Sequence, residues 1–67
     1  MMLYRYRFDL TNASDEDKLR VRKQIDHEGF TGEIIVSQSV FDAFLDENQD
    51  VETLISLPRG CTVTKLS

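Results

Sequence analysis

The sequence predicts a small α+β domain, and three observations carry that prediction. Residues 4–10 alternate between apolar and charged side chains, which is typical of a strand with one buried face. Helix-start residues and a thin apolar stripe follow over residues 14–28. Stretches 34–36 and 61–66 are rich in β-branched residues and predict further strands. We expect a three-stranded sheet with two to three helices in βαβααβ order, and a four-stranded, ferredoxin-like sheet is the alternative.

The first predicted strand separates its rings from its arginines. Its apolar positions are Tyr4, Tyr6, Phe8 and Leu10, and the positions between them are Arg5, Arg7 and Asp9. Successive side chains of a strand point to opposite faces, so we expect the rings in the core and the arginines outside. Rings that are used in the core argue against a sheet on which RNA bases stack.

The first predicted helix runs from Ser14 to Glu28. Carboxylates in its first turn favour the positive end of the helix dipole. Val21 and Ile25 form the apolar stripe, whereas Leu19 lies away from it, so most of the helix should face solvent. Gly29 is expected to end the helix.

A second predicted strand begins near Gly32. Its run Ile34-Ile35-Val36 consists of three consecutive β-branched residues. Such a run is typical of a central strand that is covered on both faces.

Residues 39–47 fit two patterns. Apolar residues at positions 40, 41, 44 and 45 share one helical arc, which predicts a second helix from Ser39 to Glu47. Phe41, Ala43 and Leu45 also alternate, so a strand remains the alternative.

The last third of the chain predicts a short helix and a closing strand. Val51, Leu54 and Ile55 have helical spacing, and the helix should end before Pro58. A turn leads to the strand over residues 61–66. Because no linker or repeat interrupts the pattern, we expect residues 1–67 to form a single compact domain.

Composition excludes several classes of protein. A chain of 67 residues with 40% hydrophobic residues has little material for an enclosed active site, so we expect no enzyme and no cofactor. A single cysteine, Cys61, forbids an internal disulfide, and one histidine, His27, forbids zinc sites with several Cys and His ligands. Asp46-Glu47-Asn48-Gln49-Asp50 begins like a calcium loop but then has Val51 where glycine is needed. We therefore predict no metal site.

Neither a membrane span nor a secretion signal is predicted. No run approaches the length of about 18 apolar residues that a span needs. The amino terminus carries Arg5 and Arg7 inside its apolar stretch, unlike a signal peptide. The expected location is the cytoplasm, including that of a host cell if the chain acts there.

Charge is distributed unevenly along the chain. Residues 26–52 contain eight Asp and Glu and no Lys or Arg, although the whole chain has a net charge of only −4. If residues 39–47 are helical, Asp42 and Asp46 lie one turn apart on the outer surface. We expect the contacts of a basic partner protein to be Asp42, Asp46, Glu47, Asp50 and Glu52. A solvated face that only keeps the protein soluble is the alternative, and the chain would then be a plain regulatory or structural subunit. Direct binding of nucleic acid is not expected, because the carboxylates repel phosphates.

In its type, this small, acidic α+β chain resembles the phage-encoded inhibitors that include the anti-CRISPR proteins. The resemblance covers the whole chain and rests on no individual motif. It implies a non-enzymatic inhibitor that presents carboxylates where DNA would bind, with a CRISPR surveillance complex as one possible target.

A local resemblance concerns two segments. Tyr4 to Leu10, which ends in Phe8-Asp9-Leu10, and Gln38-Ser39-Val40-Phe41-Asp42 are similar to the ferredoxin-fold nucleases of CRISPR adaptation and their VapD-like toxin relatives. This resemblance implies a dimer with a metal ion at Asp9, and a strand at the S-V-F segment. The chain is shorter than that family and lacks its basic middle region, which argues against a nucleic-acid substrate.

Overall fold

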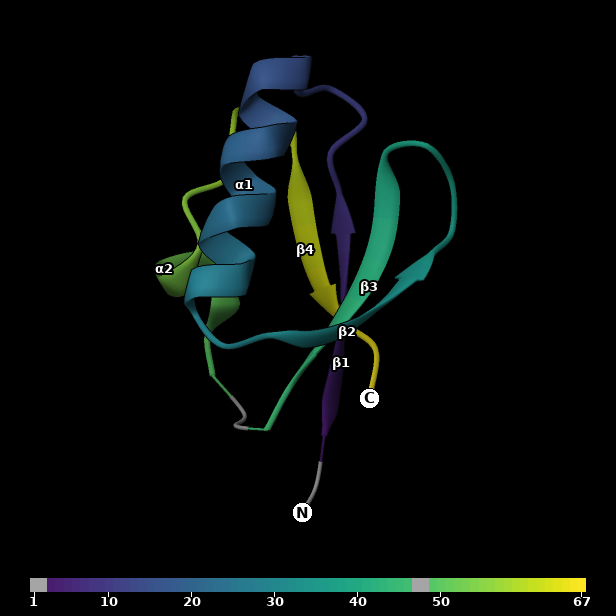
Figure 1. Cartoon of the computed structure of the whole chain (residues 1–67), viewed down its shortest axis with the longest axis vertical. Helices are drawn as coiled ribbons and strands as arrows, with labels where there is room; N and C mark the ends of the chain where they lie inside the picture. The colour runs from purple at the N-terminus through teal and green to yellow at the C-terminus, as the bar shows by residue number, and fades with distance from the viewer. Residues whose placement is uncertain (1–2, 47–48) are drawn as a thin grey trace.

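Six elements follow one another in the order βαββαβ in the computed structural model, which describes residues 3–46 and 49–67. They are β1 (Tyr4–Asp9), α1 (Asp15–His27), β2 (Thr31–Ile35), β3 (Val40–Leu45), α2 (Val51–Leu54) and β4 (Thr62–Lys65) (Figure 1). The predicted α+β class is confirmed.

The four strands form one antiparallel sheet in the order β2-β3-β1-β4. Strands β1 and β3 are central, and Phe8 lies opposite Phe41 in their register. The connection through α1 passes over β3, and the connection through α2 passes over β1. This is the ferredoxin-like arrangement of a split βαβ unit, so the four-stranded alternative is the one that the chain adopts.

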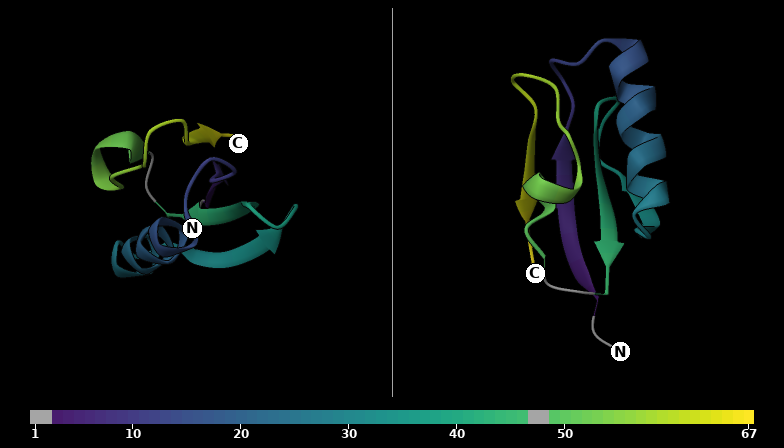
Figure 2. Two further views of the ribbon diagram at one scale, coloured as in Figure 1. Left: turned by 90° about the horizontal axis from the view of Figure 1, so that it is seen from above. Right: turned by 90° about the vertical axis from the view of Figure 1, so that its left-hand side faces the viewer.

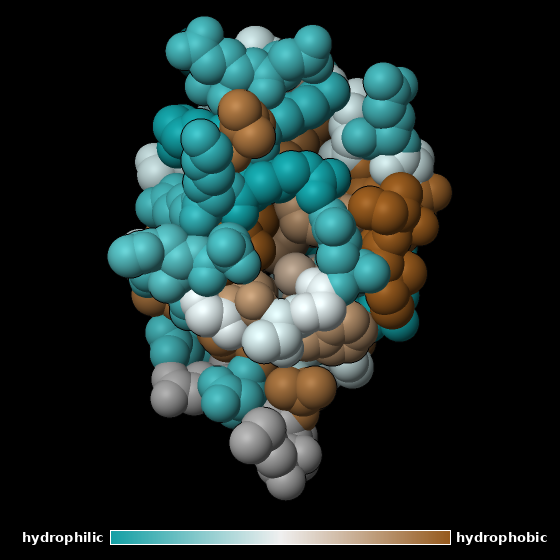
Figure 3. All heavy atoms as spheres, viewed as in Figure 1, coloured by the Kyte–Doolittle hydropathy of each residue, from teal (hydrophilic) through white to brown (hydrophobic). Residues whose placement is uncertain are grey.

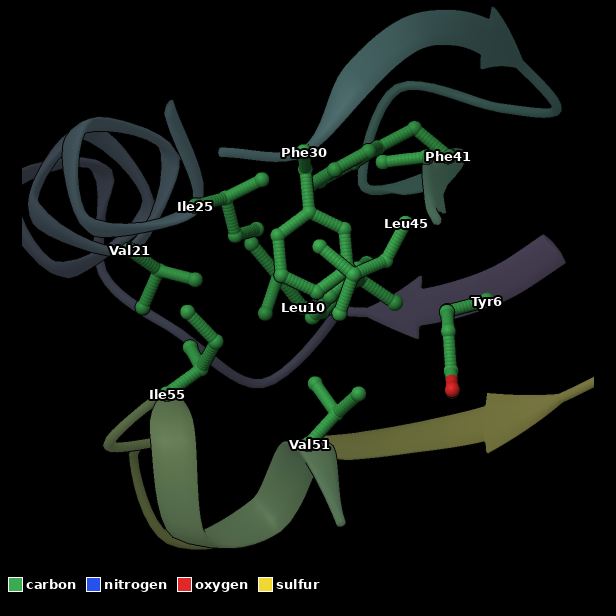
Figure 4. Packing of buried hydrophobic residues seen from close by; sticks show 11 residues of the cluster. Tyr6, Leu10, Val21, Ile25, Phe30, Phe41, Leu45, Val51 and Ile55 are labelled. Carbon is green, nitrogen blue, oxygen red and sulfur yellow. The ribbon is translucent and has the colours of Figure 1, made fainter. Parts of the chain in front are cut away.

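Both helices lie on the same face of the sheet, and the other face carries no helix (Figure 2). The core fills the layer between helices and sheet (Figure 4). Its buried members are Tyr6, Phe8, Leu10, Val21, Ile25, Phe30, Phe41, Ala43, Leu45, Val51 and Ile55. The rings of β1 belong to this core, as the alternation predicted, while Arg5 and Arg7 lie on the open face.

Helix α1 begins and ends close to where the sequence predicts. Ser14 is the N-cap, and its hydroxyl accepts a hydrogen bond from the Asp17 backbone N–H at 3.1 Å. At the other end Gly29 has φ +92°, and the Phe30 N–H donates to the Ile25 carbonyl at 3.3 Å. This is a Schellman motif, whose left-handed residue favours glycine. It turns the chain so that Phe30 enters the core.

The predicted helix over residues 39–47 is wrong. Residues 40–45 form β3, so the true order is βαββαβ rather than βαβααβ. The alternating set Phe41, Ala43 and Leu45 is buried on the helix-covered face. Val40 and Phe44 are half-buried on the open face, which is why the apolar residues fall on both sides of the strand and also match a helical arc. A strand here is what the local resemblance to ferredoxin-fold nucleases implied.

The prediction that residues 34–36 form a central, doubly covered strand is also wrong. Strand β2 lies at the edge of the sheet, and all of its residues are exposed. Its side away from β3 is not paired with any other strand of the sheet.

Candidate functional site

The open face of the sheet carries a cluster of two arginines and one aspartate. Asp42 in β3 lies directly opposite Arg7 in β1, and its side chain is completely buried. Arg7 donates from Nε to Oδ1 at 2.8 Å and from Nη2 to Oδ2 at 3.1 Å. Arg5, two residues earlier on the same face, donates from Nε to Oδ2 at 2.7 Å. Both oxygens of the Asp42 carboxylate are therefore occupied.

These contacts keep Asp42 ionised. The hydrogen bond from Arg7 lowers the pKa of Asp42, burial opposes this, and the hydrogen bond and charge of Arg5 lower the pKa further. The prediction that Asp42 belongs to an exposed acidic surface is wrong. That prediction assumed a helix, whereas in strand β3 the side chain lies between the two arginines of β1.

Three of the other predicted contacts remain at the surface. Asp46 is exposed just after β3, Asp50 is exposed at the N-cap position of α2, and Glu52 is exposed in the first turn of that helix. The Asp50 side chain makes no capping hydrogen bond. Glu47 lies outside the described residues. We call Asp46, Asp50 and Glu52 the acidic surface.

Asp50 and Glu52 come together at a shallow hollow. The hollow has a volume of about 180 Å³ and lies between α2 and the neighbouring strands β1 and β4. Lys65 of β4 lines it as well. The carboxylates at this place thus have a cation of the same chain nearby.

The carboxylates of residues 26–46 and 49–52 do not gather on one patch. Glu33 lies in the edge strand β2 and forms an ion pair with Arg22 of α1. Asp42 forms ion pairs with Arg5 and Arg7. The expected common surface is therefore reduced to the part around α2.

A second hollow, of about 340 Å³, opens between α1 and β2 (Figure 3). Phe41, Ala43 and Asp26 are among the residues that line it. The Arg22 guanidinium lies 4.1 Å from the centre of the Phe41 ring, and its ion pair with Glu33 spans from α1 to β2. Arg22 therefore fills part of this space with its own side chain.

Asp9, the centre of the alternative nuclease prediction, stabilises a turn. Its Oδ1 accepts hydrogen bonds from the Thr11 hydroxyl at 2.6 Å and from the Thr11 N–H at 3.0 Å. The bond from the hydroxyl, followed by that from the backbone, lowers the pKa of Asp9. Within residues 3–46 and 49–67, no group of three or more His, Cys, Asp or Glu side chains is placed to hold a metal ion.

Sequence reasoning missed two features of this surface. It did not pair Arg7 with Asp42, although the strand alternative for residues 40–45 together with an antiparallel register would have done so. It also placed residues 34–36 inside the sheet. For the second feature the sequence carries no signal, because the order of the strands depends on how the crossovers pack.

Comparisons of the chain with protein-family models, with curated proteins and with solved structures found no match. In the part of the chain that the structure describes, no helix is long and apolar enough to cross a membrane.

Proposed function

We propose that this chain is a non-enzymatic protein-binding inhibitor that holds a basic, nucleic-acid-binding site of a partner protein with its acidic surface. The observation that supports the proposal is the state of Asp46, Asp50 and Glu52. All three are exposed, and among the described residues none of them takes part in an ion pair.

The acidic surface differs in this respect from four other carboxylates of the chain. Asp15 and Asp17 on α1 have cationic neighbours one turn away, and Glu33 and Asp42 pair with arginines from other elements. Carboxylates that form no ion pair with another described residue leave their charge available for Lys and Arg groups of another protein. Such a surface accelerates encounter and selects partners of opposite charge.

Two carboxylates of the sheet are engaged in structural contacts. Asp9 is held by Thr11, and Asp42 is buried under Arg5 and Arg7. These contacts give Asp9 and Asp42 structural roles, so the proposed binding role rests on the remaining acidic residues.

The test is capture of basic proteins from an extract of the source organism, with the immobilised chain, at low and high salt. Charge reversal of Asp50 and Glu52 to lysine should abolish the capture, and high salt should weaken it. The matched control reverses Glu16 and Asp26, two exposed acids of α1, to lysine and so makes the same change in net charge. Equal loss in both double variants would show that only overall charge matters and would contradict the proposal.

A further inference from the structure

Strand β2 exposes an apolar edge that the proposed function does not use. Ile34, Ile35 and Val36 are 42%, 61% and 48% exposed. In Figure 3 hydrophobic atoms gather on the right-hand side of the molecule, over the end of β2. Exposed apolar edge strands tend to pair with a further strand, and proteins usually protect them with charges, with proline or by keeping them short.

The opposite edge of the sheet has such protection, whereas in β2 the register shift and the single charged residue both lie before Ile34. Strand β4 is four residues long and ends in Lys65. Between Thr31 and Phe41, Glu33 is the only charged residue, and Arg22 of the same chain neutralises it. The C-terminal half of β2 is therefore an uncharged strip on a chain of net charge −4.

The backbone of Ile35 is directed toward this free edge. Ile35 lies opposite Phe41, and the next residue, Val36, donates its N–H to the Val40 carbonyl at 2.9 Å. Hydrogen-bonded and non-hydrogen-bonded pairs alternate along an antiparallel ladder. The N–H and C=O of Ile35 consequently point away from β3.

We propose that two copies of this chain pair antiparallel through β2, about a two-fold axis at Ile35, and form a continuous eight-stranded sheet. In this register the two Ile35 residues exchange both backbone hydrogen bonds, as a hydrogen-bonded pair requires. Ile34 lies opposite Val36 of the second copy, on the open face of the sheet. Both copies thus contribute the same strip to the interface, as a two-fold interface requires.

Charge does not prevent a second copy from being the occupant. Two chains of net charge −4 repel each other over most of their surface, but the uncharged strip lets them approach. In the proposed register Glu33 lies opposite Ser37 of the second copy, so no like charges meet across the pair. A dimer also changes β2 from an edge strand into an interior strand that is paired on both sides, which satisfies the free backbone groups of Ile35.

The experiment measures the oligomeric state by sedimentation velocity from about 1 μM to about 1 mM, a range that covers weak and moderate dimers. The wild-type chain should form a dimer. Ile35→Lys should raise the dimer dissociation constant at least about tenfold, because the two introduced lysines lie opposite each other at the two-fold axis and repel. The control is Leu19→Lys, the same type of change at a leucine of α1 that is 56% exposed. It should leave the dimer unchanged.

Two outcomes of this experiment overturn the proposal. One is a wild-type chain that stays monomeric up to the highest concentration. The other is a dimer that Ile35→Lys and Leu19→Lys affect equally. Capture of a different protein on the β2 edge in place of a second copy would also overturn it.

Hydrogen exchange keeps the proposal testable if Ile35→Lys does not fold. The amide of Ile35 in the wild-type chain should exchange slowly where the dimer is populated and rapidly after dilution. The milder variant Ile35→Thr retains a β-branched side chain and should weaken the dimer by a smaller factor. Rapid exchange of the Ile35 amide within the dimer would show that the copies meet elsewhere.

Discussion

The guanidinium of Arg7 donates hydrogen bonds to both oxygens of the Asp42 carboxylate across the β1–β3 pair, at 2.8 and 3.1 Å. Arg5 adds a third hydrogen bond, so one buried anion holds two cations on the uncovered face of the sheet. Each central strand contributes to the cluster. The contact therefore connects the strand register directly with the charge distribution of the open face.

Replacing Asp42 with asparagine should destabilise the fold by about 1–3 kcal/mol. The amide is uncharged and has a single acceptor oxygen, so it leaves the two guanidinium groups with fewer partners and no counter-charge. Urea unfolding followed by circular dichroism measures the free energy of unfolding. The matched control is Asp46→Asn at an exposed position, where we expect a change within about 0.5 kcal/mol. Equal effects of the two substitutions would contradict a structural role for Asp42.

Stability should fall in acid because of Asp42 and Asp9. Hydrogen bonds lower the pKa of both carboxyl groups in the folded chain. The unfolded chain then binds protons more readily, so their contribution is present above the unfolded pKa of about 3.9 and is lost as the pH falls through the lower folded values. We expect a urea midpoint that is steady from about pH 7 to about pH 5 and that decreases below about pH 4.

Asp42→Asn provides the control for this pH dependence. The variant lacks one of the two groups, so its urea midpoint should depend less steeply on pH in the acid range than that of the wild-type chain. Parallel profiles for the two proteins would show that Asp42 does not contribute to acid sensitivity.

Local patterns were sufficient to predict most of the elements. The alternation in β1 identifies the core face because one side of that strand is apolar and the other charged. Ser14 and Gly29 mark the ends of α1 through capping chemistry, and Val21 and Ile25 form its buried stripe. These features depend on neighbours within a few residues, so the sequence alone reveals them.

Non-local features were not predictable in this way. Strand β3 packs apolar residues on both faces because it lies between two other strands, and its pattern then resembles a helical arc. Strand β2 has the composition of a central strand but lies at an edge. The burial of Asp42 depends on the β1–β3 register, which brings residues 35 positions apart into contact. The surface exposure of Asp46, Asp50 and Glu52 agrees with the sequence-based prediction.

Phe8→Ala should remove a large share of the total stability. The Phe8 ring is completely buried, stacks on Phe41 with ring centres 5.4 Å apart and meets the edge of Phe30 at 5.7 Å. Truncation of a buried phenylalanine costs about 3–5 kcal/mol, and a chain of this length has about 3–10 kcal/mol in all. Thermal unfolding should show a variant that is largely unfolded or melts far below the wild-type chain. Leu19→Ala, at an exposed position, should change the midpoint little.

Gly29→Ala tests the cost of the left-handed turn after α1. Gly29 has φ +92°, and an added Cβ would meet no atom within 4 Å. The expected loss of about 1 kcal/mol is therefore conformational rather than steric, because an L side chain rarely adopts this φ. Gly29→Asn should lose less, since asparagine tolerates the left-handed region better. Urea unfolding distinguishes the variants, and an alanine variant as stable as the wild-type chain would show that the turn adjusts without strain.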